Sequence, residues 1–109
     1  MKILFDQGTP APLRRALVAH KVETANERGW SELQNGDLIS AAEAEEFDVF
    51  VTTDRNLKYQ QNLTGRRLAI VVLLTTSWPR IRQALPVVIE AVDAATPGTY
   101  REVSVPSAA

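Results

Sequence analysis

The sequence contains no cysteine and only one histidine, His20, among its 109 residues. The lack of cysteine excludes a disulfide scaffold, a thiolate zinc site and a cysteine nucleophile. A single histidine cannot build a histidine-rich metal site. His20 falls where the first helical pattern ends, away from the acidic residues discussed below, so we expect a surface or helix-terminal role for it rather than serine-triad or other catalytic chemistry.

Strong net charge and long apolar runs are absent as well. The formal net charge is −1 and the isoelectric point is about 5.8, so nucleic acid would have to be bound through a local patch or a metal rather than through bulk positive charge. No apolar run approaches the ~18 residues that span a bilayer. The first residues also lack the pattern of a signal peptide. We therefore expect a cytoplasmic protein with no membrane partner.

Short apolar runs alternate with helical patterns along the chain. With 45% hydrophobic residues, the length suits one domain over residues 1–105, followed by a flexible tail over 106–109. The expected strands are residues 2–6, 22–25, 48–53, 68–74 and 99–105. The expected helices run from Pro10 to about His20, from Asp37 onward, over 56–63, and after Ser77, with Pro86 kinking or splitting the last one.

This alternation predicts a three-layer α/β sandwich, in which a mostly parallel sheet of four or five strands carries helices on both faces. Right-handed crossovers bring the carboxyl ends of parallel strands to one edge. If the strand at 2–6 lies between those at 22–25 and 48–53, the strand order reverses between Asp6 and Asp54. Ligands of open α/β sheets bind at such a reversal.

Three aspartates are predicted to meet at this edge. Asp6 ends the first apolar run, Asp54 ends the third, and Asp37 follows Asn35-Gly36 and opens the second helix. Converging carboxylates repel one another unless a divalent cation neutralises them. With no cysteine and no second histidine, Mg²⁺ or Mn²⁺ is favoured over zinc. Asp37 and Asp54 also have a simpler interpretation, as N-caps of the helices that follow them.

Three blocks of sequence carry a resemblance to a known family. They are KILFDQGTP with PLRRAL, NGDLISAAEAEEFDVFVTTDRNL, and RRLAIVVLL followed by a polar turn. Over about residues 1–90 the chain resembles the short PIN-like proteins, which are related to VapC-type toxin ribonucleases. The resemblance implies a PIN-like sandwich, Mg²⁺- or Mn²⁺-dependent cleavage of single-stranded RNA, and a small antitoxin partner. It maps the catalytic, metal-binding acids onto Asp6, Asp37 and Asp54.

Two positions depart from the pattern of that family. Gln7 follows Asp6 where the family has an acid, and Asn56 stands two residues after Asp54 where the family often has aspartate. Four acids are thus reduced to three, and Gln7 and Asn56 are expected to supply neutral oxygens. Such a set favours one bound cation over two.

Further residues near the predicted edge are candidates for supporting roles. We expect the hydroxyls of Thr52 and Ser77 to bond a phosphate oxygen or a metal-bound water, although strand formation and helix capping also explain them. Arg55 adjoins Asp54 and is expected to contact an RNA phosphate. Trp78 is a candidate for stacking on an RNA base, with core filling as its alternative.

Two other classes of function fit parts of the pattern. A receiver-type signalling module also has an acid after its first strand, a phospho-accepting aspartate after its third and a hydroxyl after its fourth, and Asp6, Asp54 and Thr75 or Thr76 match that layout. Against it, a single acid follows the first strand and no lysine occurs after Lys58. The third class is a catalytically inactive PIN-like interaction protein. The apolar last helix would either form a homodimer interface or pack on the sheet.

Overall fold

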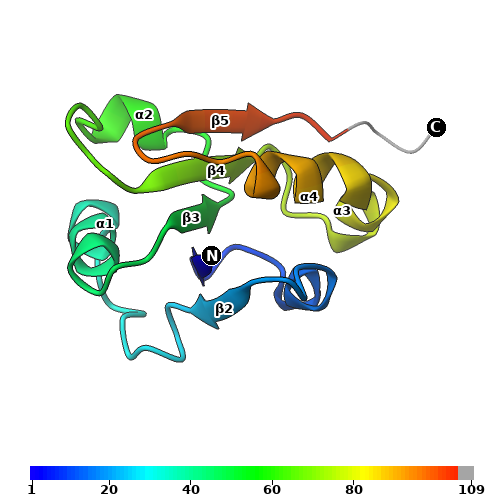
Figure 1. The fold of residues 1–109 in the computed structure, drawn as a ribbon, viewed down its shortest axis with the longest axis horizontal. Helices are drawn as coiled ribbons and strands as arrows, with labels where there is room; N and C mark the ends of the chain where they lie inside the picture. The colour runs from blue at the N-terminus through cyan, green and yellow to red at the C-terminus, as the bar shows by residue number, and fades with distance from the viewer. Residues whose placement is uncertain (106–109) are drawn as a thin grey trace.

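A computed structural model describes residues 1–105; the predicted tail at 106–109 lies outside the described residues. Five strands form one fully parallel sheet in the order β2-β1-β3-β4-β5 (Figure 1). They are β1 (Lys2–Phe5), β2 (Lys21–Thr24), β3 (Val49–Thr52), β4 (Ala69–Leu73) and β5 (Tyr100–Val103). The helical segments are η1 (Ala11–Ala16), α1 (Asn35–Ala44), α2 (Leu57–Gln60), α3 (Trp78–Gln83) and α4 (Leu85–Asp93). The parallel α/β architecture and the place of β1 between β2 and β3 confirm the prediction.

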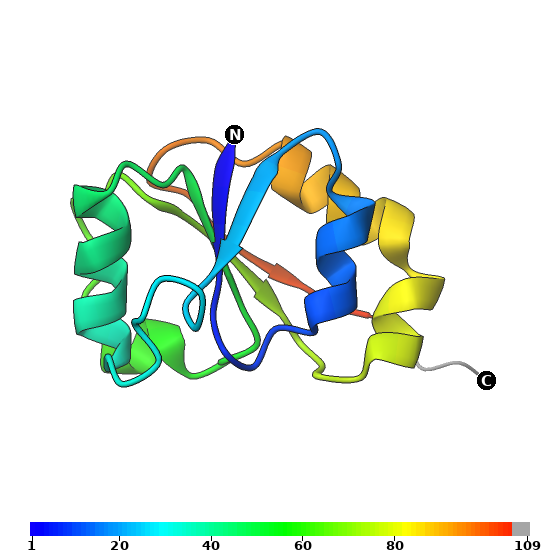
Figure 2. The ribbon, with the colours of Figure 1, turned by 90° about the horizontal axis from the view of Figure 1, so that it is seen from below.

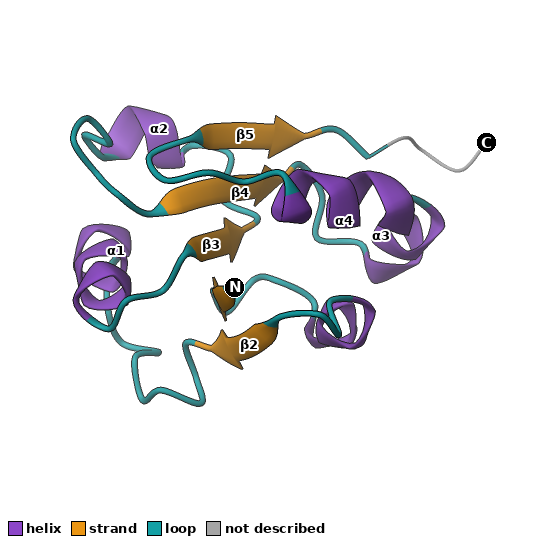
Figure 3. Ribbon diagram, viewed as in Figure 1, coloured by secondary structure: helices purple, strands orange, loops and turns teal. Residues whose placement is uncertain are grey.

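Helices cover both faces of the sheet because successive side chains of each strand point to opposite faces. Ile3 and Phe5 of β1 face one layer, whereas Leu4 faces the other, and all three are fully buried. One face packs against η1, α3 and α4, and the other against α1 and α2 (Figures 1 and 3). Among the described residues, no helix has the length and apolar character required to cross a membrane.

The connection from β4 to β5 departs from the expected right-handed rule. The β1–β2 crossover through η1 runs one way across the sheet, and the β4–β5 crossover through α3 and α4 runs the other way, yet both lie on the same face (Figure 1). The two crossovers therefore have opposite hands. The crossovers through α1 and α2 agree in hand with η1, so β4–β5 is the left-handed one, which is rare. Its strands remain parallel, so all five carboxyl ends still share one edge.

Several helix boundaries differ from the predicted ones. The first helix is a 3₁₀ helix that ends at Ala16, well before His20. Beyond η1, Leu17 is buried, but Val18 is 85% exposed, so the apolar spacing of a longer amphipathic helix is not realised there. The third helix covers only Leu57–Gln60 rather than 56–63. The last helix divides at Ala84, and Pro86 lies in the first turn of α4, which confirms the predicted effect of that proline.

His20 lies just before β2 begins, at the amino edge of the sheet. Its Nε2 is 2.6 Å from Asp93 Oδ1 at the end of α4, and its Nδ1 is 3.0 Å from the N-terminal nitrogen. These contacts join α4 to the start of β1. The predicted helix-terminal place of His20 is therefore wrong, because η1 ends at Ala16, but its expected distance from the carboxyl edge that carries Asp6 and Asp54 is confirmed.

Glu43 of α1 is the main polar anchor between that helix and β4. Its carboxylate accepts hydrogen bonds from Arg66 Nη1 at 2.7 Å, from the backbone N–H of Arg67 at 2.7 Å and from that of Leu68 at 3.2 Å. Burial tends to raise the pKa of Glu43, but these hydrogen bonds outweigh it and hold the pKa below its ordinary value of 4.5. The ionised carboxylate therefore stabilises the folded state.

Replacing Glu43 with glutamine should lower the free energy of unfolding by about 1–3 kcal/mol at pH 7, because charge-assisted hydrogen bonds are lost. Since the folded-state pKa is depressed, this contribution is present above the unfolded pKa and disappears as pH falls through the folded one. Urea unfolding at pH 7 and pH 3 should show the difference from wild type shrinking at low pH. Glu90→Gln, at an exposed position of α4, is the control; equal effects of both variants at pH 7 would contradict the assignment.

Candidate functional site

Asp6 and Asp54 follow the two central strands β1 and β3 at the carboxyl edge of the sheet, which is the lower edge for β1 and β2 in Figure 2. The chain leaves β1 toward β2 and leaves β3 toward β4, so the direction of winding reverses between these two strands. The two carboxylates therefore stand at the topological switch point, where open α/β sheets bind ligands. This placement confirms the geometry predicted for Asp6 and Asp54.

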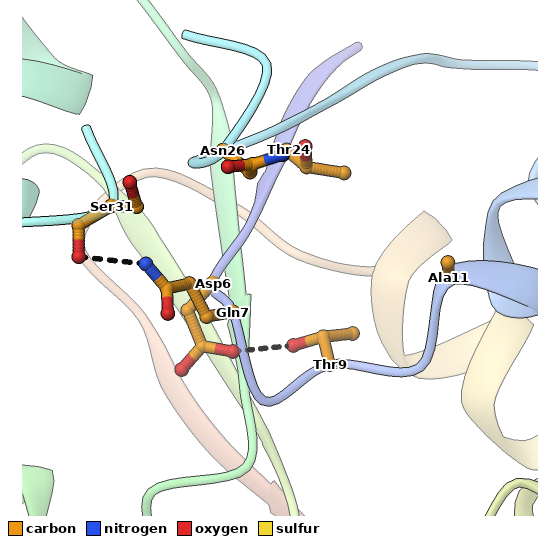
Figure 4. A pocket seen from close by; sticks show the side chains of 7 residues that line it. All are labelled: Asp6, Gln7, Thr9, Ala11, Thr24, Asn26 and Ser31. Atoms are coloured by element: carbon orange, nitrogen blue, oxygen red, sulfur yellow. Dashed lines mark hydrogen bonds between the residues drawn. The ribbon is translucent and has the colours of Figure 1, made fainter. Parts of the chain in front are cut away.

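Two threonine hydroxyls fix the carboxylate of Asp6. Thr9 Oγ1 donates to Oδ1 at 2.7 Å (Figure 4), and the hydroxyl of Thr52 donates to Oδ2. Both threonines are buried, with exposures of 7% and 0%. Since a carboxylate oxygen has two acceptor sites, each oxygen of Asp6 keeps one for another ligand.

Asp54 is held by neutral groups in a similar way. Its backbone N–H donates to Thr52 Oγ1 at 3.1 Å, its Oδ2 accepts from Asn35 Nδ2 at 2.7 Å, and its Oδ1 accepts from the Asn56 N–H at 3.0 Å. Thr52 therefore connects the two aspartates; its predicted bonding of a phosphate oxygen or a metal-bound water stays a prediction. Neither carboxylate forms an ion pair within residues 1–105.

Asp37 does not belong to this pair. It is exposed in the first turn of α1, and residues 1–105 contain no group of three or more Asp, Glu, His or Cys side chains placed to hold a metal ion. The predicted convergence of three carboxylates is therefore wrong. The difference lies at the start of α1: the N-cap is Gln34 rather than Asp37, and Asn35, at the first helical position, bonds Asp54, whereas Asp37 is exposed to solvent.

Asn35 is the site residue that the sequence interpretation missed. The sequence analysis begins the second helix at Asp37, whereas Asn35 is the first residue of α1. Its amide nitrogen bonds Asp54, which leaves its carbonyl oxygen as a neutral oxygen ligand. The helix therefore contributes an amide where the sequence suggested an acid.

Gln7 and Asn56 flank the two carboxylates. Gln7 Nε2 donates to the Ser31 carbonyl at 2.7 Å (Figure 4), so its own carbonyl oxygen remains for a ligand. Asn56 is exposed and donates its backbone N–H to Asp54 Oδ1; the N-cap of α2 is Asn56 itself, so the interpretation of Asp54 as that N-cap is wrong. That the side chain of Gln7 or Asn56 supplies an oxygen ligand to a metal ion stays a prediction.

The other predicted residues have structural contacts of their own. The Ser77 hydroxyl accepts from the Arg80 N–H at 3.4 Å as the N-cap of α3. Trp78 is half-buried and packs against the core. Arg55 is exposed and donates to the Leu74 carbonyl at 2.7 Å, at the end of β4. The alternatives of capping and core filling therefore account for Ser77 and Trp78, whereas Arg55 keeps a place beside the site.

Two cavities open on either side of the Gln7–Ser31 hydrogen bond, and Asp6 and Gln7 line both. The larger, of about 410 Å³, exposes both polar and apolar lining atoms, and the smaller, of about 180 Å³, extends toward Trp30 and Asn35. Gly8 in the adjoining turn lies against β3, where an added Cβ would be 2.7 Å from Thr53 Oγ1. A larger residue at this position would displace the turn that carries Asp6.

The donor set fits a hard divalent cation. Mg²⁺ in proteins takes one or two carboxylates and keeps several waters, and this edge of the sheet offers the carboxylates of Asp6 and Asp54, each held by hydrogen bonds. It has no thiolate or imidazole that would favour zinc. The open cavities leave room for the waters and for a substrate.

The Thr52 hydroxyl should couple energetically to Asp6. In a double-mutant cycle on unfolding free energy, Thr52→Val and Asp6→Asn should show an interaction energy of about 1–2 kcal/mol, because both remove the same buried hydrogen bond. The matched cycle with Asp37→Asn should be additive within about 0.5 kcal/mol. Additivity in the Asp6 cycle would show that Thr52 does not hold this carboxylate.

The chain was also compared with known proteins. No family model, no curated protein and no solved structure matches it.

Proposed function

We propose that the protein is a PIN-like ribonuclease that depends on Mg²⁺ or Mn²⁺ and cleaves single-stranded RNA. The observation that supports this most is the pair Asp6 and Asp54, which lies at the strand-order reversal and is fixed entirely by neutral donors. Two carboxylates that follow neighbouring strands at one edge of the sheet, without cationic partners among the described residues, carry a negative charge that a divalent ion would neutralise. The resemblance of the sequence blocks to PIN-like proteins supplies the reaction class.

Asp6 and Asp54 would hold the cation, with carbonyl oxygens of Asn35 and Gln7 next to them. When bound, the cation would lower the pKa of a water and stabilise charge on phosphoryl oxygens. Thr9 and Thr52 keep Asp6 in one orientation, which lowers the cost of arranging the site. Arg55 stands beside Asp54 and would contact a neighbouring phosphate of the RNA.

We further propose that this nuclease is the toxin of a toxin–antitoxin pair. It rests on the resemblance to VapC-type toxins. The antitoxin would be a small protein that covers or inhibits the edge carrying Asp6 and Asp54.

A receiver-type phospho-acceptor module is the second candidate, because the strand order β2-β1-β3-β4-β5 is the flavodoxin-like order of receiver domains. Asp54 after β3 would then accept the phosphoryl group. Two features weigh against it. The β4–β5 crossover lies on the face of η1 rather than that of α1 and α2, and residues after Lys58 contain no lysine.

Cleavage of a labelled single-stranded RNA should require Mg²⁺ or Mn²⁺, stop with chelator and return when either ion is added. Asp6→Asn and Asp54→Asn should each reduce kcat/KM by roughly 100-fold or more, because each removes a metal-binding carboxylate. Asp37→Asn is the matched control and should change it less than about threefold, because that side chain lies outside the pair.

Other results would support the other candidates. Unchanged cleavage by Asp6→Asn or Asp54→Asn would contradict the nuclease assignment. Tight binding of a phosphate analogue at Asp54 without cleavage would favour the receiver module. An absence of both cleavage and millimolar metal binding in calorimetry would favour an inactive interaction protein.

A further inference from the structure

We propose that the larger cavity beside Asp6 binds the nucleoside part, ribose and base, of one unpaired RNA nucleotide and so sets the sequence preference. This rests on the proposed ribonuclease function. The cavity lies between the carboxyl ends of β1 and β2 and the start of η1 (Figure 4). Its volume of about 410 Å³ lies within the roughly 300–1,000 Å³ typical of small-molecule sites.

The chemistry of the lining selects a neutral ligand that forms hydrogen bonds. Apart from Asp6, which lies between Ser31 and Thr9 (Figure 4), the described lining consists of uncharged residues: Gln7, Thr9, Ala11, Thr24, Asn26 and Ser31. With no Lys or Arg among them, the cavity itself offers nothing to neutralise a phosphate. Its amides and hydroxyls suit the donors and acceptors on the edge of a base and on ribose.

The position of Asp6 determines where the phosphate and the nucleoside of one nucleotide would lie. Asp6 belongs to both the carboxylate pair and the cavity wall. A phosphate placed at the carboxylate pair would therefore have its attached nucleoside next to the cavity entrance. Base pairing would block entry, because the hydrogen-bonding edge of a paired base is already occupied, so the ligand is an unpaired nucleotide.

The wall that carries Asn26 is preorganised. The Glu27 N–H donates to Thr24 Oγ1 at 3.1 Å, and the Trp30 N–H donates to the Ala25 carbonyl at 2.8 Å. Arg14 of η1 holds Glu27 at 2.7 Å. Gln7 closes the other side through its bond to the Ser31 carbonyl. A site whose groups are already positioned loses less entropy on binding and discriminates better between ligands.

Two substitutions test the cavity by different means. Asn26→Ala removes an exposed amide from the wall, whereas Ala11→Phe fills the space and leaves every polar group in place. Gln83→Ala is the matched control, because it removes an exposed amide at the end of α3 that does not line the cavity. All three positions are on the surface, so the fold should tolerate the changes.

The measurement is an amide NMR titration of the full chain, without added metal, with adenosine, cytidine, guanosine, uridine and, separately, inorganic phosphate. At least one nucleoside should give saturable shifts at Gln7, Asn26 and Ser31, and phosphate should not. Asn26→Ala and Ala11→Phe should weaken the apparent affinity about 10-fold or more, corresponding to one or two lost base contacts. Gln83→Ala should leave it unchanged.

No saturable shift with any nucleoside, or unchanged binding by Ala11→Phe, would overturn the proposal. RNA cleavage distinguishes this failure from failure of the nuclease assignment. If RNA is cleaved with the same base preference by wild type and Asn26→Ala, the nuclease stands and the nucleoside site falls. If a nucleoside binds as described but no RNA is cleaved with Mg²⁺ or Mn²⁺, the nucleoside site stands and the hydrolytic function falls.

Discussion

The pairing of β1 with β3 is the interaction on which the site depends. In its register Phe5 lies opposite Val51, and the Asp6 N–H continues the ladder to the Val51 carbonyl at 3.1 Å. The next residue of β3 is Thr52, so the register itself brings its hydroxyl to the Asp6 carboxylate. A shift of one residue would turn Thr52 and Phe50 to the other face and would break the core and the site together.

Much of the fold could be predicted because its signals are local. Apolar runs bounded by polar turns located all five strands, and the continuously apolar β4 indicated a strand buried on both faces. The hand of the β4–β5 crossover could not be predicted, since it depends on how α3 and α4 pack against η1 rather than on any short pattern. The short lengths of η1 and α2 likewise could not be predicted, because they depend on which apolar side chains each segment buries in the folded protein.

The site could be predicted in part. Asp6 and Asp54 directly follow recognisable strands, so their place needed only the sheet topology. The place of Asp37 could not be predicted because α1 begins two residues earlier than expected, and two residues correspond to about 200° around a helix. Ser77 caps α3 and Trp78 packs against the core. The sequence alone could not decide between these structural roles and contact with RNA. The conclusion is a site of two carboxylates and neighbouring amides, supported by two buried hydroxyls.

This two-carboxylate site predicts a specific position for a bound cation. Anomalous diffraction from a crystal soaked with manganese tests it most directly. The account predicts one ion between Asp6 and Asp54, within about 2.0–2.3 Å of at least one carboxylate oxygen, with waters in its remaining positions and Asp37 outside its shell. A crystal that shows no ion at this edge, or an ion bound only at Asp37, would contradict it.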